Sequence, residues 1–231
     1  MPLTSFRCSS SSMALVAGLG LSLVLAGCAT TRATRSVEPS GFLGDYSQLR
    51  AGEGDEAQLI YIDRRVSFAS YNAVIVDSVT FWETGQSKVS DEDKQMLTDQ
   101  LYLSLSNKLK ERGFAVVERP GPNVLRLRAA ITEARGAKTI ANAVTSIVPQ
   151  ARLITTLGGM ATDTAVLVGK AGIEVDITDS LSGRRVAAGV DERVGTKAVR
   201  AALSEWKHVT EAFDYWAGRI AKRLEELRAA G

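Results

Sequence analysis

SDEDKQMLTDQLYLSLSNKLKER, residues 90–112, sets the architecture of this chain, because an apolar residue returns at every fourth position. The recurring residues are Leu97, Leu101, Leu105 and Leu109. This spacing puts them on one side of a helix. Ser90 suits the N-cap, Asp91–Asp93 lie where the helix dipole is positive, and Gly113 follows a basic last turn. The sequence therefore predicts a long amphipathic helix that buries a leucine face.

A second amphipathic helix is expected near the C-terminal end. Its apolar residues are spaced three or four apart throughout: Trp206, Val209, Phe213, Trp216, Ile220, Leu224 and Leu227. One face of this helix is strongly apolar, so it also needs a surface to cover.

Strands supply that surface. Residues 73–79 form a β-branched apolar run that is typical of a strand buried on both faces. In residues 125–131, apolar side chains alternate with Arg126 and Arg128, which predicts a strand with one wet face. Shorter strands are expected at residues 59–62 and 114–117.

A hairpin follows later in the chain. Residues 173–177 and 186–190 both alternate, and a turn is expected between them at Asp179–Gly183. Together the elements predict an α+β fold, with a mainly antiparallel sheet of about five strands and two long amphipathic helices on one face.

The first 27 residues are expected to be a signal peptide. Arg7 is their only charge, and residues 13–27 are apolar or small. Such a run is too short to span a bilayer, which takes about 20 residues, and it matches the apolar region of a secretory signal. Met13 is an alternative start, but the apolar run would then lack a basic flank.

The run ends in Leu25-Ala26-Gly27-Cys28, which resembles the lipobox of bacterial lipoproteins. We therefore expect cleavage between Gly27 and Cys28, and acyl chains such as palmitate on Cys28 that anchor the protein to a membrane. An ordinary signal peptide or a buried N-terminal helix are the alternatives. Ala29 stands where an aspartate would signal inner-membrane retention. The resemblance thus implies the periplasmic face of the outer membrane, if the host is a proteobacterium.

After the signal peptide, the chain is expected to consist of a tether and one domain. Residues 28–40 are mostly small and polar and predict a flexible tether. Residues 41–231 are long enough for a single domain. With 28 basic and 26 acidic side chains, the precursor is nearly neutral, so nothing indicates a nucleic-acid partner. Cys8 leaves with the signal, so a lipidated Cys28 leaves no thiol for a disulfide.

Few residues are candidates for chemistry. His208 is the only histidine, and with no free cysteine it does not predict a metal site. Glu174 with Asp176, and Asp191 with Glu192, are close in sequence, but the simplest interpretation places them on a solvated strand face. His208 is likewise expected at the surface. We predict no cofactor and no enzymatic activity, with a hydrolase that uses carboxylates alone as a remote alternative.

Residues 136–169 form an unusual insertion with three charged residues, and their apolar residues have helical spacing around Pro149. Four interpretations are open: core packing, a subunit contact, contact with the membrane surface, or a lid over an apolar pocket. Trp82 could extend such a surface, although ordinary packing is the simpler expectation. The possible interaction surface consists of Ile140, Val144, Ile147, Leu153, Leu157 and Trp82.

Several motifs resemble a family of bacterial lipoproteins with domain of unknown function 3313. These motifs are SGFLGDYS at residues 40–47, YID at 61–63, YNAVIVDSV at 71–79, AGIEV at 171–175 and DSLSGR at 179–184. The resemblance implies a lipoprotein that faces the periplasm, and it assigns no catalytic residues.

These observations predict a non-enzymatic cell-envelope lipoprotein that binds a protein partner or associates with itself. The alternative is a periplasmic carrier or sensor of an apolar ligand.

Overall fold

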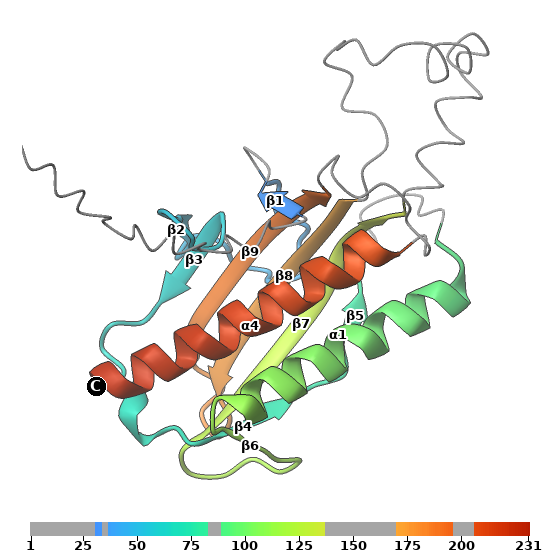
Figure 1. The fold of residues 1–231 in the computed structure, drawn as a ribbon. Coiled ribbons are helices and arrows are strands. Elements are labelled where there is room, and N and C mark those ends of the chain that lie inside the picture. The colour runs from blue at the N-terminus through green and yellow to red at the C-terminus, as the bar shows by residue number, and fades with distance from the viewer. Residues whose placement is uncertain (1–30, 34–36, 83–88, 137–169, 196–205) are drawn as a thin grey trace, which may run out of the picture.

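The computed structural model describes residues 31–33, 37–82, 89–136, 170–195 and 206–231. Within these residues the chain forms a nine-stranded sheet, and two long helices lie side by side on one of its faces (Figure 1). The helices are α1 (Asp91–Glu111), α4 (Lys207–Ala230) and a short 3-10 helix, η1 (Phe68–Ser70). The strands are β1 (Thr31–Ala33), β2 (Arg50–Ala51), β3 (Leu59–Ile62), β4 (Ala73–Val76), β5 (Thr80–Phe81), β6 (Ala115–Val116), β7 (Val124–Arg135), β8 (Lys170–Asp179) and β9 (Arg185–Gly195).

The strands follow the order β2-β3-β9-β8-β7-β4-β6, while β1 also pairs with β9 and β5 with β7. The centre is antiparallel, and β8 and β9 form the expected hairpin. A bulge between Ile131 and Glu133 interrupts the pairing of β7 with β8. Arg126 and Arg128 on β7 are exposed, as the alternation predicted.

The prediction of about five strands was wrong. The described residues contain nine strands, and β4 runs parallel to both β6 and β7. The missed strands β1, β2 and β5 have only two or three residues, too few for a period of two to be recognised. The parallel pairing follows from the long α1 connection, because such a crossover brings the chain back in its original direction.

The two amphipathic helices form as predicted. The Ser90 hydroxyl accepts a hydrogen bond from the Asp93 N–H at 3.1 Å, which caps α1. Gly113 follows α1 with a φ of +77°, a conformation that favours glycine. The four leucines of the predicted stripe, Leu97, Leu101, Leu105 and Leu109, have no exposed surface, and they share one core with Phe213 and other apolar residues of α4.

A second, smaller core lies on the sheet face opposite the helices. Leu43 packs there against Ala188 and Val190 of β9, with the rings of Phe42 and Tyr46 beside it. The chain immediately after the predicted tether is therefore folded onto the back of the sheet.

Candidate functional site

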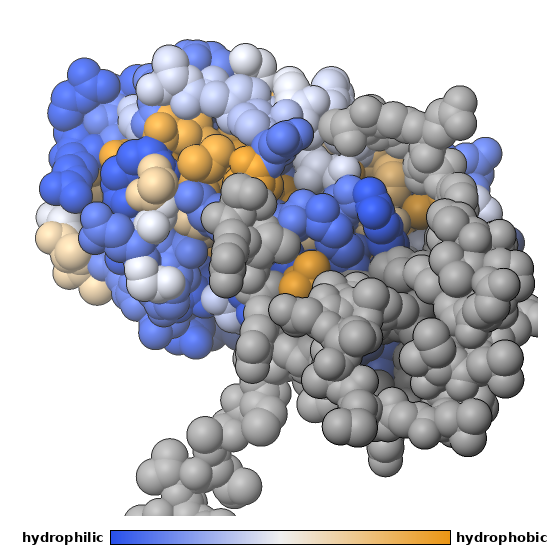
Figure 2. Space-filling model, turned by 90° about the horizontal axis from the view of Figure 1, so that it is seen from above, coloured by the Kyte–Doolittle hydropathy of each residue, from blue (hydrophilic) through white to orange (hydrophobic). Residues whose placement is uncertain are grey.

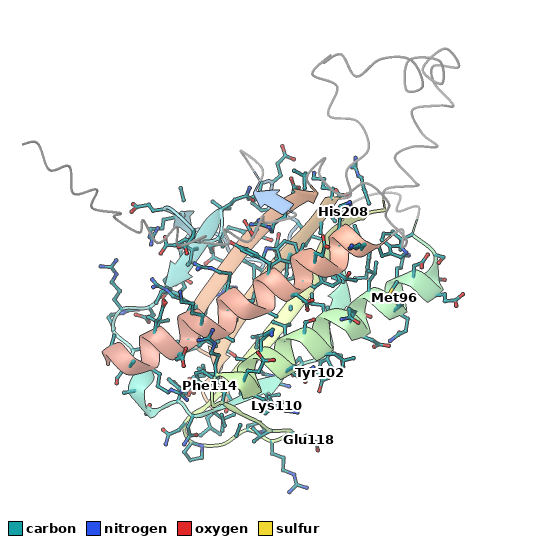
Figure 3. All side chains as sticks on the ribbon, viewed as in Figure 1. Met96, Tyr102, Lys110, Phe114, Glu118 and His208 are labelled. Carbon is teal, nitrogen blue, oxygen red and sulfur yellow. The ribbon has the colours of Figure 1, made fainter. Side chains whose placement is uncertain are left out.

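The outer surface carries exposed apolar residues on the helix side of the sheet. Met96 and Tyr102 project from α1 (Figure 3), and the adjacent Leu103 is 51% exposed. Seen from above, apolar residues lie in one larger patch and in smaller separate spots among mainly hydrophilic residues (Figure 2). Apolar patches on a folded surface often mark contact sites.

A groove on the same side follows from the widths of the two layers. A helix is about 10 Å wide, and neighbouring strands are about 4.8 Å apart, so two helices cover about four strands. Seven strands follow one another across this sheet. Because α1 contacts β4, β5 and β6, and α4 contacts β8 and β9, the strand β3, next to the edge strand β2, extends beyond the helix layer.

The space between β3 and α4 is an apolar groove of about 180 Å³, which we call the β3–α4 groove. Its walls are mainly aliphatic. They include Ile60 and Ile62 of β3, Ile173 and Val175 of β8, and Ile220 and Leu224 of α4. The side chains of Ile60, Ile62 and Ile220 are only half-buried, so a partner could cover further apolar surface there.

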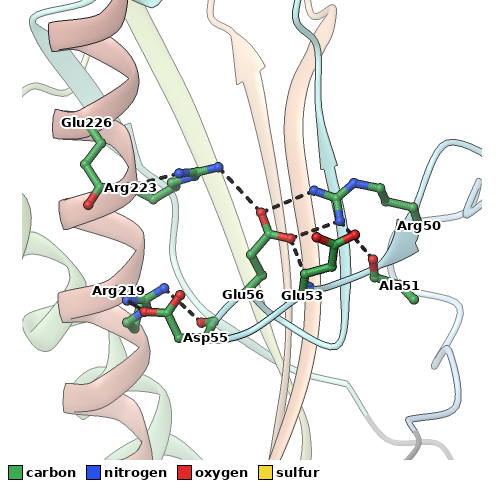
Figure 4. Close-up of polar contacts among 8 residues, drawn as sticks. All are labelled: Arg50, Ala51, Glu53, Asp55, Glu56, Arg219, Arg223 and Glu226. Atoms are coloured by element: carbon green, nitrogen blue, oxygen red, sulfur yellow. Dashed lines mark hydrogen bonds and ion pairs between the residues drawn. The ribbon is translucent and has the colours of Figure 1, made fainter.

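Ion pairs join the two sides of this groove at its rim (Figure 4). Arg219 of α4 binds the Asp55 carboxylate and also donates to the Asp55 carbonyl at 2.8 Å. Arg223 lies 3.5 Å from Glu56, which Arg50 also binds, at 2.9 Å. The Arg50 guanidinium holds the pKa of Glu56 below its ordinary value, so this carboxylate remains charged at neutral pH. Because the pairs are partly exposed, salt screens them, and they tether the β2–β3 turn to α4 only weakly.

Asp191 lies in the inner wall of the groove, whereas the other acidic residues that line it among the described ones lie at its rim. Its carboxylate accepts a hydrogen bond from the Trp216 indole N–H at 2.6 Å. Burial raises the pKa of Asp191 above its ordinary value. The expectation of a solvated Asp191 was therefore wrong, because the helix that covers β9 excludes water from this position.

Glu174 and Asp176 were also expected on a solvated face, and this was wrong as well. Glu174 is fully buried beneath residues 40–46. Its carboxylate accepts hydrogen bonds from the Ser40 N–H at 2.6 Å, the Leu43 N–H at 3.3 Å and the Tyr46 hydroxyl at 2.5 Å. Three donors thus compensate for the desolvation of one buried charge.

Arg185 strengthens the same attachment. It binds Asp176 at 2.7 Å and donates to the carbonyl oxygens of Asp45, at 2.7 Å, and Leu43, at 2.9 Å. The segment after the tether is therefore fixed through both its N–H and its carbonyl groups. We call residues 40–46 the docked segment.

His208 lies in the first turn of α4 (Figure 3) and is only 5% exposed, so the expectation of a surface histidine was wrong. Its Nδ1 lies 3.6 Å from Oε2 of Glu211. Among the described residues, neither of these two atoms has a hydrogen-bond partner. The periodicity placed His208 beside the apolar stripe but could not show how deeply the first turn is buried.

The structure places only part of the predicted sites. Gly27 and Cys28 lie outside the described residues, as do Ile140, Val144, Ile147, Leu153 and Leu157. Trp82 is 38% exposed, donates from its indole N–H to the Ser40 carbonyl at 3.2 Å, and packs edge-on against Phe42. Trp82 therefore contacts the docked segment.

Sequence reasoning missed the groove. The acidic residues of the β2–β3 turn and the arginines of α4 are far apart in the chain and have no shared spacing. In the parts of the chain that the structure describes, no group of three His, Cys, Asp or Glu residues is arranged to hold a metal ion. Within the same parts, no helix is both long and apolar enough to cross a membrane.

Comparison with solved structures finds distant similarities. The PelC dodecamer from Paraburkholderia phytofirmans is 12% identical, with a TM-score of 0.40 over 69% of this chain and 91% of that one. A minor lipoprotein from Acinetobacter baumannii is 12% identical, with a TM-score of 0.36 over 68% of this chain and 95% of that one. A DUF330 protein from Xanthomonas campestris is 7% identical, with a TM-score of 0.42 over 67% and 84%.

No curated protein matches the sequence. A family model does, over residues 38–220, and its description is "Protein of unknown function (DUF3313)". The match spans the docked segment, the sheet apart from β1, α1 and the first half of α4, which is well over half of the sequence. The chain therefore belongs to the DUF3313 family.

Proposed function

We propose that this chain is a cell-envelope lipoprotein, anchored through acylated Cys28 at the periplasmic face of the outer membrane, whose domain is a non-enzymatic protein-interaction or assembly module. The position of the β3–α4 groove supports this proposal. The groove opens on the helix side of the sheet, whereas the docked segment that follows the tether lies on the opposite side. The anchor thus leaves the groove free for a partner.

The groove favours one kind of partner. Its aliphatic walls match an apolar stripe on a helix or strand of another protein. Its rim offers Arg219 and Arg223 together with Asp55 and Glu56, so the matching segment has charges of both signs beside its apolar stripe. Rim charges of this kind contribute more to partner choice than to affinity.

Photocrosslinking in intact cells tests the proposal. A photoreactive amino acid replaces Lys222, which lines the groove, and in a matched variant it replaces the exposed Lys110 at the end of α1. We expect a specific adduct from position 222 and a much weaker one from position 110, with the partner identified by mass spectrometry. Recovery of monomer alone from both variants would contradict an interaction module.

The aliphatic walls also favour a second function, that of a carrier or sensor of an apolar ligand. A soluble form that begins after Cys28, purified without detergent, should then retain a lipid in native mass spectrometry. An Ile173→Asp variant should lose that lipid, while a protein that is empty from the start would exclude this function.

A further inference from the structure

The ends of β1, β7, β8 and β9 meet at one end of the sheet, and β1 is the strand that follows the predicted lipid on Cys28 most closely in the chain. Thr31 of β1 pairs with Gly195, the last residue of β9, and Ala33 pairs with Arg193. At the same end, Lys170 of β8 pairs both with Val194 of β9 and with Arg135 of β7. We call residues 31–33, 133–135, 170–171 and 193–195 the anchor end.

The reach of the chain restricts where the membrane can be. Cys28 precedes Thr31 by three residues, and three extended residues span at most about 11 Å. Without β1, the first residue held on the domain would be Val37, and about nine residues would allow roughly 30 Å of free reach. The pairing of β1 with β9 therefore replaces a long tether with a short one.

We propose that the anchor end rests on the head groups of the bilayer, so that the far end of the β8–β9 hairpin points away from the membrane. This inference depends on the acylation of Cys28 that is part of the proposed function. When the Cys28 sulfur is acylated, at most about 11 Å of chain lies between it and β1. The anchor end therefore has to stay within about this distance of the bilayer surface.

The side chains of the anchor end suit a zwitterionic surface. The ammonium of Lys170 lies 2.7 Å from Glu192 and 4.0 Å from Glu133, and Arg135 binds Glu133 at 2.7 Å. Lys170 and Arg135 are thus balanced by Glu133 and the adjacent Glu192, whereas Arg32 and the buried Arg193 leave the anchor end with a positive excess. We expect contact with zwitterionic phospholipid, which anionic lipid should strengthen without being required. Both connections of the weakly charged residues 137–169 are also made here, at the end of β7 and the start of β8.

Site-specific fluorescence quenching tests this orientation. The mature chain has no cysteine besides Cys28, whose sulfur the acyl group would block, so Arg135→Cys and Leu181→Cys can each be labelled selectively. Position 181 is 64% exposed in the β8–β9 turn, about 35 Å from the anchor end, since ten extended residues separate the two. The lipidated full-length variants, in phosphatidylcholine vesicles, are exposed to a phospholipid with a nitroxide on its head group.

We expect at least threefold stronger quenching at position 135 than at position 181. Equal quenching, or stronger quenching at position 181, would overturn the orientation. Flotation with the vesicles separates the two proposals: wild-type protein that does not float refutes the anchor, whereas protein that floats without the quenching difference refutes only the orientation.

A β1 variant tests whether the pairing of β1 with β9 sets this orientation. Thr31→Pro combined with Ala33→Pro removes two backbone N–H donors from β1 and should disrupt its pairing with β9. Flotation should persist while the quenching difference falls to less than half, because the longer tether permits other orientations. A difference that stays unchanged while flotation persists would show that β1 does not set the orientation.

Discussion

Replacement of Glu174 by glutamine should release the docked segment while the rest of the domain stays folded. The carboxylate of Glu174 offers two acceptor oxygens to three donors, and all three donors come from residues 40–46. A glutamine side chain offers one acceptor oxygen, and its NH₂ group would meet either the Ser40 N–H or the Leu43 N–H and Tyr46 hydroxyl. At least one buried donor therefore loses its acceptor.

The expected magnitude follows from these contacts. A hydrogen bond to a charged group contributes about 1.5–3 kcal/mol, and a neutral acceptor makes a bond roughly half as strong. One bond is lost and the remaining ones weaken, while removal of a buried charge offsets part of the loss. We expect docking of residues 40–46 to weaken by about 2–3 kcal/mol, which is a roughly 30- to 150-fold increase in the open population.

Hydrogen exchange at the Ser40 and Leu43 amides measures this population directly. Tyr71→Phe is the matched control, because it removes a hydroxyl-to-carboxylate bond of 3.0 Å to Asp179, distant from the docked segment. Exchange at Ser40 and Leu43 should accelerate strongly in Glu174→Gln and follow only global stability in Tyr71→Phe. If both variants changed these two amides by the same factor, Glu174 would not be what holds the segment.

Three further predictions concern the core, the bulge and the groove. Leu101→Ala should lower the free energy of unfolding by about 2–5 kcal/mol in urea denaturation, because Leu101 is fully buried, and a loss below 1 kcal/mol would contradict its place in the core. Gly172→Ala should lose about 1–3 kcal/mol, since a β-carbon there would lie 2.7 Å from the Thr132 hydroxyl, and an unchanged denaturation midpoint would show that the bulge adapts freely. Because burial raises the pKa of Asp191, the native state holds this proton more tightly than the unfolded chain, whose value is near 3.8, so wild-type stability should fall as the pH rises through the interval between the two values. Asp191→Asn should remove that fall in urea titrations at acidic and neutral pH, and an identical pH dependence in both proteins would refute the assignment.

The sequence was most informative where one period repeats many times. The leucine stripe of α1 extends over about three turns and the apolar stripe of α4 over almost six, so chance spacing is a poor explanation of either. The β8–β9 hairpin was predictable for a similar reason, because strands of ten and eleven residues show their alternation clearly. The strands β2 and β5 have two residues each, too few to show an alternation, and β5 pairs with β7, which is distant in the chain.

The main error of the sequence-based predictions was to place buried polar residues of the sheet in solvent, and this error has one physical cause. Alternation correctly placed Glu174 and Asp176 on the face opposite the helices, but whether that face is wet depends on what covers it. The cover is the docked segment, which lies 134 residues before Glu174 in the chain. No local pattern in β8 contains this information, and the same limitation applied to Asp191 beneath α4.

The distant partnership between Glu174 and the docked segment also constrains the order of folding. Residues 40–46 leave the ribosome early, but their binding site forms only after β8 has been made and paired. Until then their hydrogen bonds to Glu174 cannot form, and neither can the pairing of β3 with β9. Contacts between such distant residues form slowly, because a long loop must close first. The N-terminal part of this domain is therefore among the last to become ordered, and protection of the Ser40 amide would report that folding of the whole sheet is complete.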